Sequence, residues 1–424
     1  MDAQPLPSAA HPPAATERLR WEAMPDCYRP DYARSLTGVF PTLFSLLGRP
    51  APGHADLLHC LPADSPRKAR RGFVLCLDGM GFKEMALSGR FRALYPRYGT
   101  WITSVFPTIT SCALSSLYQA LPPARHGILG HYVWKDFPGA VVDMLRMQVH
   151  GANAPLHAAG FDVQRWKQEP GILESPAAEG LPGHQLMHYS IVNSGLSTYS
   201  YGKAQLGGFA ETLEGFTKAA RLLQGMDTGW VGLYLATVDT LSHSLTGDSP
   251  QVGLALRQIE EALSWMVGTL TPEVARETAL FVVADHGQST LVHTMAWSAE
   301  ERDRLLAGTR ALGFSGRVMH LYFKPGKEEE ILAWLRPRIA HAGQVFRFDE
   351  VGDLIGPAKD PAFARQSLGD AVALLREGYN WDKAGLLVTK RVYPSDLVSQ
   401  HGGLSWDEMF VPLLCAPLTA MLGE

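Results

Sequence analysis

Three continuous apolar segments constrain the fold of this chain more than any other feature. Each one runs into an acidic residue, and together they are residues 72–78 (GFVLCLD), 230–239 (WVGLYLATVD) and 279–286 (ALFVVADH). Such runs are typical of parallel strands that are covered by helices on both faces. Helical spacing marks residues 111–121, 209–224 and 251–269. The alternation predicts an α/β fold with a central, mostly parallel sheet flanked by helices.

The later part of the chain has a different pattern, from about residue 290 to 395. Strand-like segments lie at 316–323, 344–350 and 370–381, and a helical segment lies at 328–340. This pattern predicts either a smaller cap subdomain inserted into the main fold or an added antiparallel edge. We expect residues 1–40 to form a flexible N-terminal extension, since the first 16 are rich in Pro and Ala. Residues 41–424 would then form one catalytic domain.

Composition narrows the classes of function. Apolar residues make up 46% of the chain and charged residues 19%, which permits a sizeable core and excludes general disorder. The net charge of −4 gives no support for binding a nucleic-acid polymer, although a small anionic substrate remains compatible with it. The five cysteines contain no CxxC pair, so we expect free thiols rather than disulfides or a cysteine zinc site.

The chain shows no signal of secretion or membrane insertion. No apolar segment follows a basic start at the N-terminus, and no run of about 18 apolar residues occurs. We therefore expect no contact with a membrane and a cytoplasmic location.

The acidic residues at the ends of the apolar runs are Asp78, Asp239 and Asp285. Ligands of open α/β sheets bind at the carboxyl ends of the strands. A single Asp in this position often caps the following helix. Three of them favour a common function.

Histidines accompany these carboxylates. His243 follows Asp239 by four residues, His286 follows Asp285 directly, and His401 lies in QHGG near the C-terminus. Imidazoles and carboxylates are ligands of zinc and similar divalent ions. Six such side chains suffice for two metal sites, which can stabilise the attacking and the leaving oxygen of an in-line displacement.

A nucleophile is expected beside these ions. Thr110 follows a strand and a turn at Pro107, and it would lie at or near the N-terminus of a helix that favours anions. Metal coordination would activate its weakly nucleophilic hydroxyl. Thr108 and Ser111 are alternatives. Cys112 lacks the sequence context in which a sulfatase cysteine is converted to formylglycine.

Five motifs follow one another between about residue 72 and residue 416: LDGMG, FPTITS followed by LPPARHGILG, VDTLSH, ADHG and QHGG. With these motifs the chain resembles the alkaline phosphatase superfamily, and within it the type I phosphodiesterases and nucleotide pyrophosphatases, where the motifs occur in the same order. The resemblance implies an alkaline-phosphatase-like fold and two divalent metal ions, with zinc expected and manganese as an alternative.

The resemblance also implies roles for individual residues. One metal would be held by Asp239, His243 and His401, and the other by Asp78, Asp285, His286 and Thr110. Thr110 would attack phosphorus to form a phospho-threonine intermediate that water hydrolyses. The expected partner is a small phosphorylated substrate with a phosphodiester or pyrophosphate bond. The alternatives are an activity like that of phosphonoacetate hydrolase, a pathway-specific phosphatase, or a non-catalytic binding member.

One position departs from the family pattern. Members that cleave nucleotides usually carry Asn three residues after the nucleophile, where this chain has Ala113. Asn193, His131 and Lys135 are candidates for a replacement, and the sequence selects none of them. For His126, His293 and His320 we expect structural roles rather than metal binding.

Overall fold

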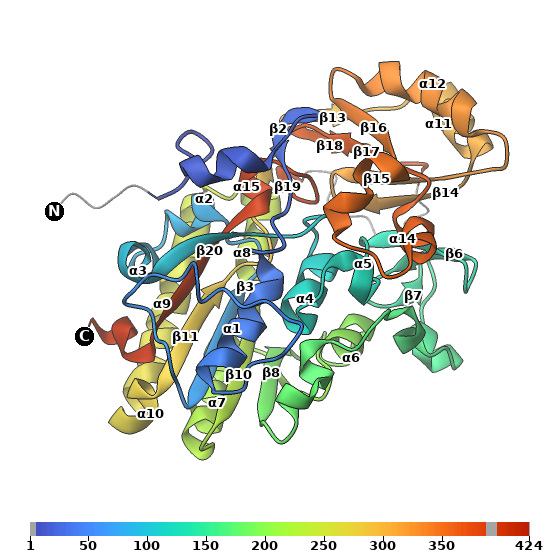
Figure 1. Ribbon diagram of the computed structural model, residues 1–424. Coiled ribbons are helices and arrows are strands. Elements are labelled where there is room, and N and C mark those ends of the chain that lie inside the picture. The colour runs from blue at the N-terminus through green and yellow to red at the C-terminus, as the bar shows by residue number, and fades with distance from the viewer. Residues whose placement is uncertain (1–5, 387–396, 424) are drawn as a thin grey trace.

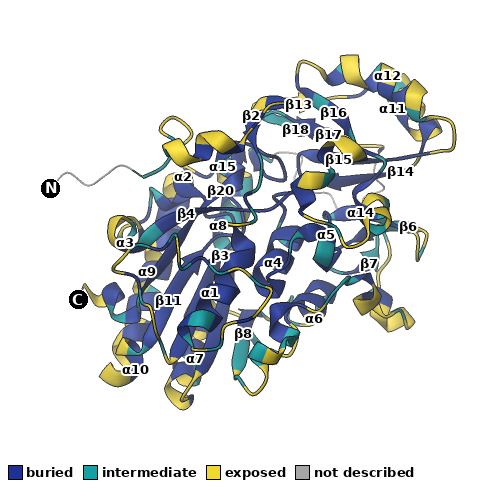
Figure 2. Ribbon diagram, viewed as in Figure 1, coloured by how far each residue is buried: buried dark blue, intermediate teal, exposed yellow. Residues whose placement is uncertain are grey.

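The computed structural model describes residues 6–386 and 397–423 of the chain. Its larger sheet has seven strands in the order β4-β20-β11-β3-β10-β8-β9. The three central strands are β11 (Thr278–Val283), β3 (Arg71–Leu77) and β10 (Gly229–Leu235), and they run parallel to one another. All of their residues are buried (Figure 2), as the continuous apolar runs in the sequence predict.

Further strands extend this sheet on both sides. On one side β8 (Gly183–His188) and β9 (Gln205–Phe209) continue the parallel arrangement. On the other side β20 (Phe410–Pro417) is antiparallel to both β11 and β4 (Gly99–Thr103). The sheet is therefore mostly parallel with one reversed strand, which agrees with the predicted fold class.

Helices cover both faces of the larger sheet (Figure 1). On one face, Phe40 of α1 (Val39–Leu46) packs against Trp230 of β10. On the other face, Phe216 of α7 (Thr212–Gly225) packs against Phe73 of β3. The helix α4 (Thr110–Gln119) lies beside α1, and α9 (Pro250–Thr269) lies beside α7.

Shorter helices complete the connections. They are α2 (Phe82–Met85), α3 (Arg90–Tyr98), α5 (Pro123–His126), α6 (Gly195–Ser200), α8 (Thr237–Leu245), α10 (Pro272–Arg276), α13 (Phe348–Val351), α14 (Pro361–Leu368) and α15 (Trp406–Met409). Within the described ranges, no helix combines the length and the apolar character that crossing a bilayer requires.

A second sheet has its own core and also has seven strands; it is called the smaller sheet because several of its strands are short. Its order is β16-β17-β15-β14-β5-β6-β7, and every pairing is antiparallel. The strands are β5 (Tyr132–Lys135), β6 (Ala140–Asp143), β7 (Gln148–Val149), β14 (Thr309–Ser315), β15 (Val318–Phe323), β16 (Gly343–Arg347) and β17 (Ala371–Leu375). Two helices, α11 (Ala299–Gly308) and α12 (Glu328–Ile339), cover it (Figure 1).

The smaller sheet differs from the expected insertion in one respect. Four of its strands and α12 fall within residues 290–395, but β5, β6 and β7 come from residues 132–149. It is a separate sheet and not an added edge of the larger one. Residues 387–395 of the expected insertion lie outside the described residues. Short paired segments join neighbouring loops, among them β12 (Ser289–Thr290) with β19 (Ser399–Gln400) and β13 (His293–Met295) with β18 (Tyr379–Trp381).

The N-terminal region is packed where a flexible extension was expected. The hairpin of β1 (Arg20–Trp21) and β2 (Met24–Tyr28) places Trp21 against Phe346 of the smaller sheet. The expected boundary at residue 40 falls inside α1. Residues 1–5 lie outside the described part. The expectation for residues 19–40 is corrected because apolar side chains such as Trp21 and Phe40 are buried there.

Candidate metal centre

Two of the acidic residues meet where neighbouring parallel strands end. Asp78 directly follows β3, and Asp285 lies two residues after β11. Register places Val283 of β11 beside Cys76 of β3, so both carboxylates reach the same edge of the larger sheet. This is the edge at which open α/β sheets bind ligands.

Asp239 reaches the same edge from a helix rather than from a strand. The strand β10 ends at Leu235, and Asp239 lies in the first turn of α8. Its backbone N–H donates to the Asp78 carbonyl at 3.0 Å. Because residues four apart share one face of a helix, His243 lies beside it. The sequence expectation that Asp239 ends a strand is therefore corrected.

The first group of candidate ligands surrounds the Asp239 carboxylate. Its Oδ1 lies 3.3 Å from Nε2 of His243 and 3.4 Å from Nε2 of His401. His401 follows β19, more than 150 residues along the chain from Asp239. The structure thus brings together the three residues assigned to one metal.

The second group surrounds Nε2 of His286. This atom lies 3.4 Å from Oδ1 of Asp78, 3.3 Å from Oδ2 of Asp285 and 3.2 Å from Oγ1 of Thr110. The His286 ring stacks on the His401 ring with 3.6 Å between centroids. The two groups are therefore adjacent, and potential ligand atoms of Asp239, His286 and His401 lie within 4.8 Å of one another.

The three imidazoles are all oriented through Nδ1. This atom contacts Ser399 O at 2.8 Å in His243, Gly287 O at 3.1 Å in His286 and Thr108 O at 2.9 Å in His401. A carbonyl oxygen can only accept, so Nδ1 must carry the proton in each ring. The lone pair of each Nε2 then faces the carboxylates, as metal-binding histidines require.

The buried carboxylates leave one oxygen each without a protein donor. Oδ2 of Asp78 accepts from the Tyr234 hydroxyl, and Oδ1 of Asp285 accepts from the backbone N–H groups of Gly79 at 3.1 Å and His286 at 3.0 Å. Oδ1 of Asp78 and Oδ2 of Asp285 have no hydrogen-bond partner among the described residues. Unpartnered buried oxygens that converge on one point fit a cation.

The electrostatics support the same interpretation. Burial, together with the neighbouring Asp285, raises the pKa of Asp78 well above its usual value, and burial raises the pKa of Asp285. Burial also raises the pKa of Asp239, but the adjacent His243 outweighs it, so the net shift is downward. Burial lowers the pKa of His401, which keeps its imidazole neutral. Imidazole nitrogens and buried carboxylates together are a donor set suited to divalent ions.

The candidate nucleophile lies at the N-terminus of α4. Thr110 is the first residue of that helix and is half-buried, with its hydroxyl directed to His286. The two alternatives are fully buried and bonded to backbone. The Thr108 hydroxyl donates to Gly403 O at 2.8 Å, and the Ser111 hydroxyl donates to Gly130 O at 2.9 Å.

The three residues considered as replacements for the missing Asn have other partners or are exposed. Ala113 is fully buried in the hydrophobic core. The Lys135 ammonium is buried between the Trp166 and Phe363 rings and donates to Gly127 O at 3.1 Å. His131 stacks on Tyr132 and lies 3.6 Å from the Asp143 carboxylate, while Asn193 is exposed.

Other histidines have structural surroundings. His126 is buried and contacts the Ser116 hydroxyl at 2.9 Å, and His320 is buried and contacts the Ser315 hydroxyl at 2.7 Å. His293 is exposed on β13. These surroundings match the roles expected from the sequence.

Two supporting residues were missed by the sequence reasoning. Tyr234 of β10 donates to Asp78, and the Gln288 amide donates to Oδ1 of Asp239 at 2.6 Å. Tyr234 lies in an apolar run that indicates only a strand, so no signal marks it. Gln288 follows ADHG by one residue, and this proximity was its only signal.

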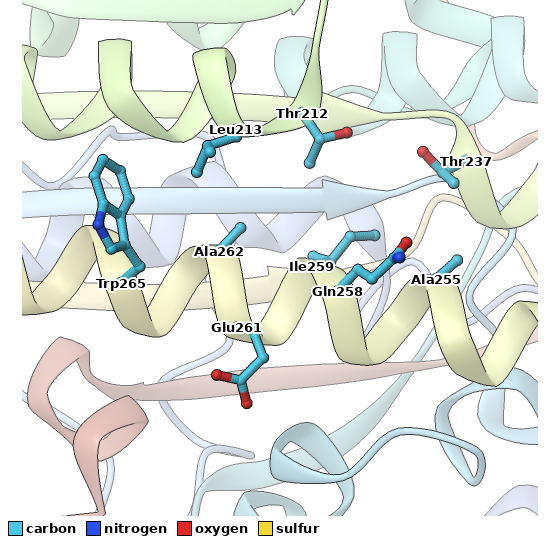
Figure 3. A pocket seen from close by; sticks show the side chains of 9 residues that line it. All are labelled: Thr212, Leu213, Thr237, Ala255, Gln258, Ile259, Glu261, Ala262 and Trp265. Atoms are coloured by element: carbon cyan, nitrogen blue, oxygen red, sulfur yellow. The ribbon is translucent and has the colours of Figure 1, made fainter.

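A surface pocket lies between α7 and α9, with Thr237 at the start of α8 also in its lining (Figure 3). It is lined by Thr212, Leu213, Thr237, Ala255, Gln258, Ile259, Glu261, Ala262 and Trp265. None of the seven candidate site residues lines it.

Comparison with known families now identifies the class of protein. The family model described as type I phosphodiesterase / nucleotide pyrophosphatase matches residues 73–382. The chain belongs to this family. The match includes every candidate site residue except His401, which lies after residue 382. In the folded chain His401 lies beside Asp239 and His286. The family lies within the alkaline phosphatase superfamily, and its chemistry is phosphoester hydrolysis.

Solved structures share the fold at low sequence identity. Murine ectonucleotide pyrophosphatase / phosphodiesterase 5 is 16% identical with a TM-score of 0.60, covering 81% of this chain and 87% of its own. Phosphonoacetate hydrolase from Sinorhizobium meliloti 1021 in complex with phosphonoformate is also 16% identical, with a TM-score of 0.58, and the coverage is 86% and 98%. No curated protein sequence gives a significant match.

Proposed function

We propose that this chain is a two-metal hydrolase of phosphodiester or pyrophosphate bonds in which Thr110 is the nucleophile. The observation that carries the proposal is the position of the Thr110 hydroxyl, 3.2 Å from Nε2 of His286 and beside the unpartnered carboxylate oxygens. The N-terminus of α4 adds partial positive charge at this point, which favours an anionic group.

The ligand assignment follows the two groups around the site. Asp239, His243 and His401 would hold one ion, and Asp78, Asp285, His286 and Thr110 would hold the other. Zinc is proposed because nitrogen and carboxylate ligands suit it, with manganese as the alternative. When bound, two divalent ions supply the positive charge that favours the alkoxide and offsets the charge developing on the phosphoryl oxygens.

The proposed reaction has two covalent steps. The oxygen of Thr110 bonds to phosphorus as its proton passes to solvent water, while the bond from phosphorus to the leaving oxygen breaks and that oxygen takes up a proton from water. A water molecule then attacks the phosphorus of the phospho-threonine, the bond from phosphorus to the Thr110 oxygen breaks, the phosphoryl product leaves and the hydroxyl is protonated again. Tyr234 keeps Asp78 in place, and Gln288 keeps Asp239 in place, so the ligands need little reorganisation during the reaction.

Replacement of Thr110 tests the nucleophile. We expect Thr110→Ala to lower the turnover of an activated aryl phosphodiester by several orders of magnitude, because the attacking oxygen is lost. Thr110→Ser keeps a hydroxyl and serves as the matched control, with measurable turnover expected. Metal content should fall little in either variant, because three further ligands remain. Turnover close to that of the wild type in Thr110→Ala would place the nucleophile elsewhere.

A phosphonate substrate is the second candidate. Murine ectonucleotide pyrophosphatase / phosphodiesterase 5 has been solved as an inactive variant with AMP, and the Sinorhizobium meliloti hydrolase with phosphonoacetate. Ala113 favours the second comparison, since this chain lacks the Asn of nucleotide-cleaving members. A panel of monoester, diester, pyrophosphate and phosphonate substrates, ranked by kcat/KM, decides between them. Preference for phosphonates would replace the diester assignment and leave the site intact.

A further inference from the structure

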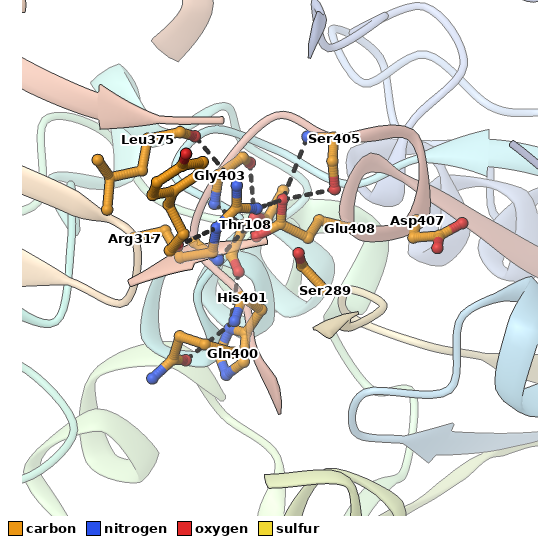
Figure 4. Close-up of polar contacts among 12 residues, drawn as sticks. Thr108, Ser289, Arg317, Leu375, Gln400, His401, Gly403, Ser405, Asp407 and Glu408 are labelled. Atoms are coloured by element: carbon orange, nitrogen blue, oxygen red, sulfur yellow. Dashed lines mark hydrogen bonds and ion pairs between the residues drawn. The ribbon is translucent and has the colours of Figure 1, made fainter. Parts of the chain in front are cut away.

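The loop of residues 401–405, called the His401 loop below, is held from one side by Thr108 (Figure 4). Thr108 is fully buried, and its carbonyl accepts from Nδ1 of His401 at 2.9 Å. Its hydroxyl donates to Gly403 O at 2.8 Å and accepts from the Gly402 N–H at 3.0 Å. One residue therefore fixes both the ring of His401 and the backbone that follows it.

The smaller sheet supports the loop from the other side. Arg317, in the turn between β14 and β15, donates its backbone N–H to His401 O at 3.1 Å. Its guanidinium is fully buried, pairs with Glu408 and donates to Leu375 O at 3.0 Å and Tyr379 O at 3.1 Å. The turn is thus tied both to the His401 loop and to α15, which carries Glu408.

Glu408 completes the support from α15. Its carboxylate accepts from the Gly403 N–H at 2.9 Å, and from the N–H and hydroxyl of Ser405 at 3.1 and 2.7 Å. Polar groups of this buried loop are therefore paired on both sides. A shift of the loop would leave several of them unpaired, at about 1–3 kcal/mol for each group.

We propose that Thr108 is a positioning residue for His401, and that the Arg317–Glu408 pair supports the same loop. The role rests on the proposed function, because it assumes that His401 is a metal ligand. Thr108 fixes the proton on Nδ1 and directs Nε2 toward Asp239, 3.4 Å away. Without the hydroxyl, the Gly402 N–H and the Gly403 carbonyl each lose a partner. The Thr108 carbonyl remains, so the loss acts on His401 through the position of the loop backbone that carries it.

A matched pair of substitutions separates positioning from stability. Thr42 of α1 is also fully buried, and its hydroxyl donates to Gly38 O at 2.6 Å and accepts from the Leu57 N–H at 2.7 Å. Thr108→Val and Thr42→Val therefore remove the same type of group with the same change of shape. The measurement is calorimetric titration of each metal-free variant with Zn²⁺ alone, together with its unfolding temperature.

The expected result distinguishes the two positions. Thr108→Val should weaken one of two zinc sites by about 10- to 100-fold, the range usual for changes behind a metal ligand, because the loop that carries His401 loses two of its hydrogen bonds. Thr42→Val should lower stability and leave both zinc affinities unchanged. Thr108→Ser retains the hydroxyl and should restore the weakened site. Two unaltered zinc sites in Thr108→Val would overturn the proposal.

A reference variant separates this proposal from the proposed function. His401→Ala should remove the same zinc site that Thr108→Val weakens. If His401→Ala leaves the titration unchanged, the ligand set is wrong and the positioning role is overturned with it. If only Thr108→Val leaves it unchanged, the positioning role alone is overturned. Should Thr108→Val fail to fold, Glu408→Gln decides by the same titration, with weakening expected and unaltered affinity contradicting the proposal.

Discussion

At the scale of single residues, hydrogen bonds from neighbouring groups orient the side chains of several candidate ligands. The imidazoles of His243, His286 and His401 would each have two possible proton positions in isolation, and a backbone carbonyl at Nδ1 selects one. Asp78 is oriented by Tyr234 in the same manner. Residue type supplies the capacity to bind a metal, and the second partner supplies the direction.

A histidine outside the centre gives a prediction for pH. Burial lowers the pKa of His320 to about 4, while its Nδ1 donates to Leu368 O at 2.7 Å. The pKa in the unfolded chain is about 6.5, so below that pH only the unfolded chain takes up the proton. The stability that His320 contributes is complete above pH 6.5 and is lost as the pH falls toward 4.

The measurement compares unfolding in denaturant at pH 7 and pH 4.5. Between these values we expect the wild type to lose about 2–3 kcal/mol more than His320→Asn, which keeps a donor but does not titrate. Other titrating groups are common to both proteins and cancel in the difference. Equal losses in the two proteins would show that His320 is not held neutral in the fold.

At the scale of elements, the turn between β14 and β15 approaches the His401 loop too closely for a side chain. Gly316 has φ of +57°, and a Cβ atom there would overlap the carbonyl oxygen of His401. Glycine is needed at this position for two reasons, the left-handed backbone and the contact between the loops. The turn thereby joins the smaller sheet to the candidate metal centre.

Substitution of this glycine tests the contact. Gly316→Ala should destabilise the protein and weaken zinc binding at the His401 site, since the new methyl group displaces the loop. Gly326 also has positive φ, +74°, and a Cβ atom there meets nothing within 4 Å, so Gly326→Ala is the matched control. It should show the backbone cost of about 1–2 kcal/mol and normal zinc affinity. Equal zinc affinity in both variants would contradict the contact.

At the scale of the whole molecule, the candidate ligands join regions that are far apart in the chain. Asp78 and Asp285 come from strand ends of the larger sheet, Asp239 from α8, and His401 from a loop that the smaller sheet supports. Ions bound at such a point stabilise the folded state, because the unfolded chain does not offer the site.

Removal of metal should therefore change both activity and stability. When the free concentration of an ion is 100 times its Kd, its binding adds about 2.7 kcal/mol to the free energy of unfolding. A chelator should therefore lower the Tm and abolish hydrolysis. Dialysis followed by addition of zinc or manganese should restore both. Metal analysis of the purified protein should give close to two ions per chain. Full activity in demonstrably metal-free protein would exclude the two-metal proposal.

Much of the larger sheet could be predicted from the sequence. Continuous apolar runs indicate burial on both faces, as in parallel strands covered by helices, and they located β3, β10 and β11. Helical spacing located α4, α7 and α9 for a similar local reason. The types and order of the candidate ligands could also be predicted, because Asp and His beside strand ends already indicate metal chemistry.

The tertiary structure decided the rest. β5, β6 and β7 join the smaller sheet through pairing with β14, more than 150 residues away, and no local pattern encodes that partner. In the sequence Thr108 is a possible nucleophile, yet contact with Gly402 and Gly403 gives its hydroxyl another use. Sequence periodicity reports which face of an element is buried, whereas the orientation of a ligand depends on contacts that form only when distant segments meet.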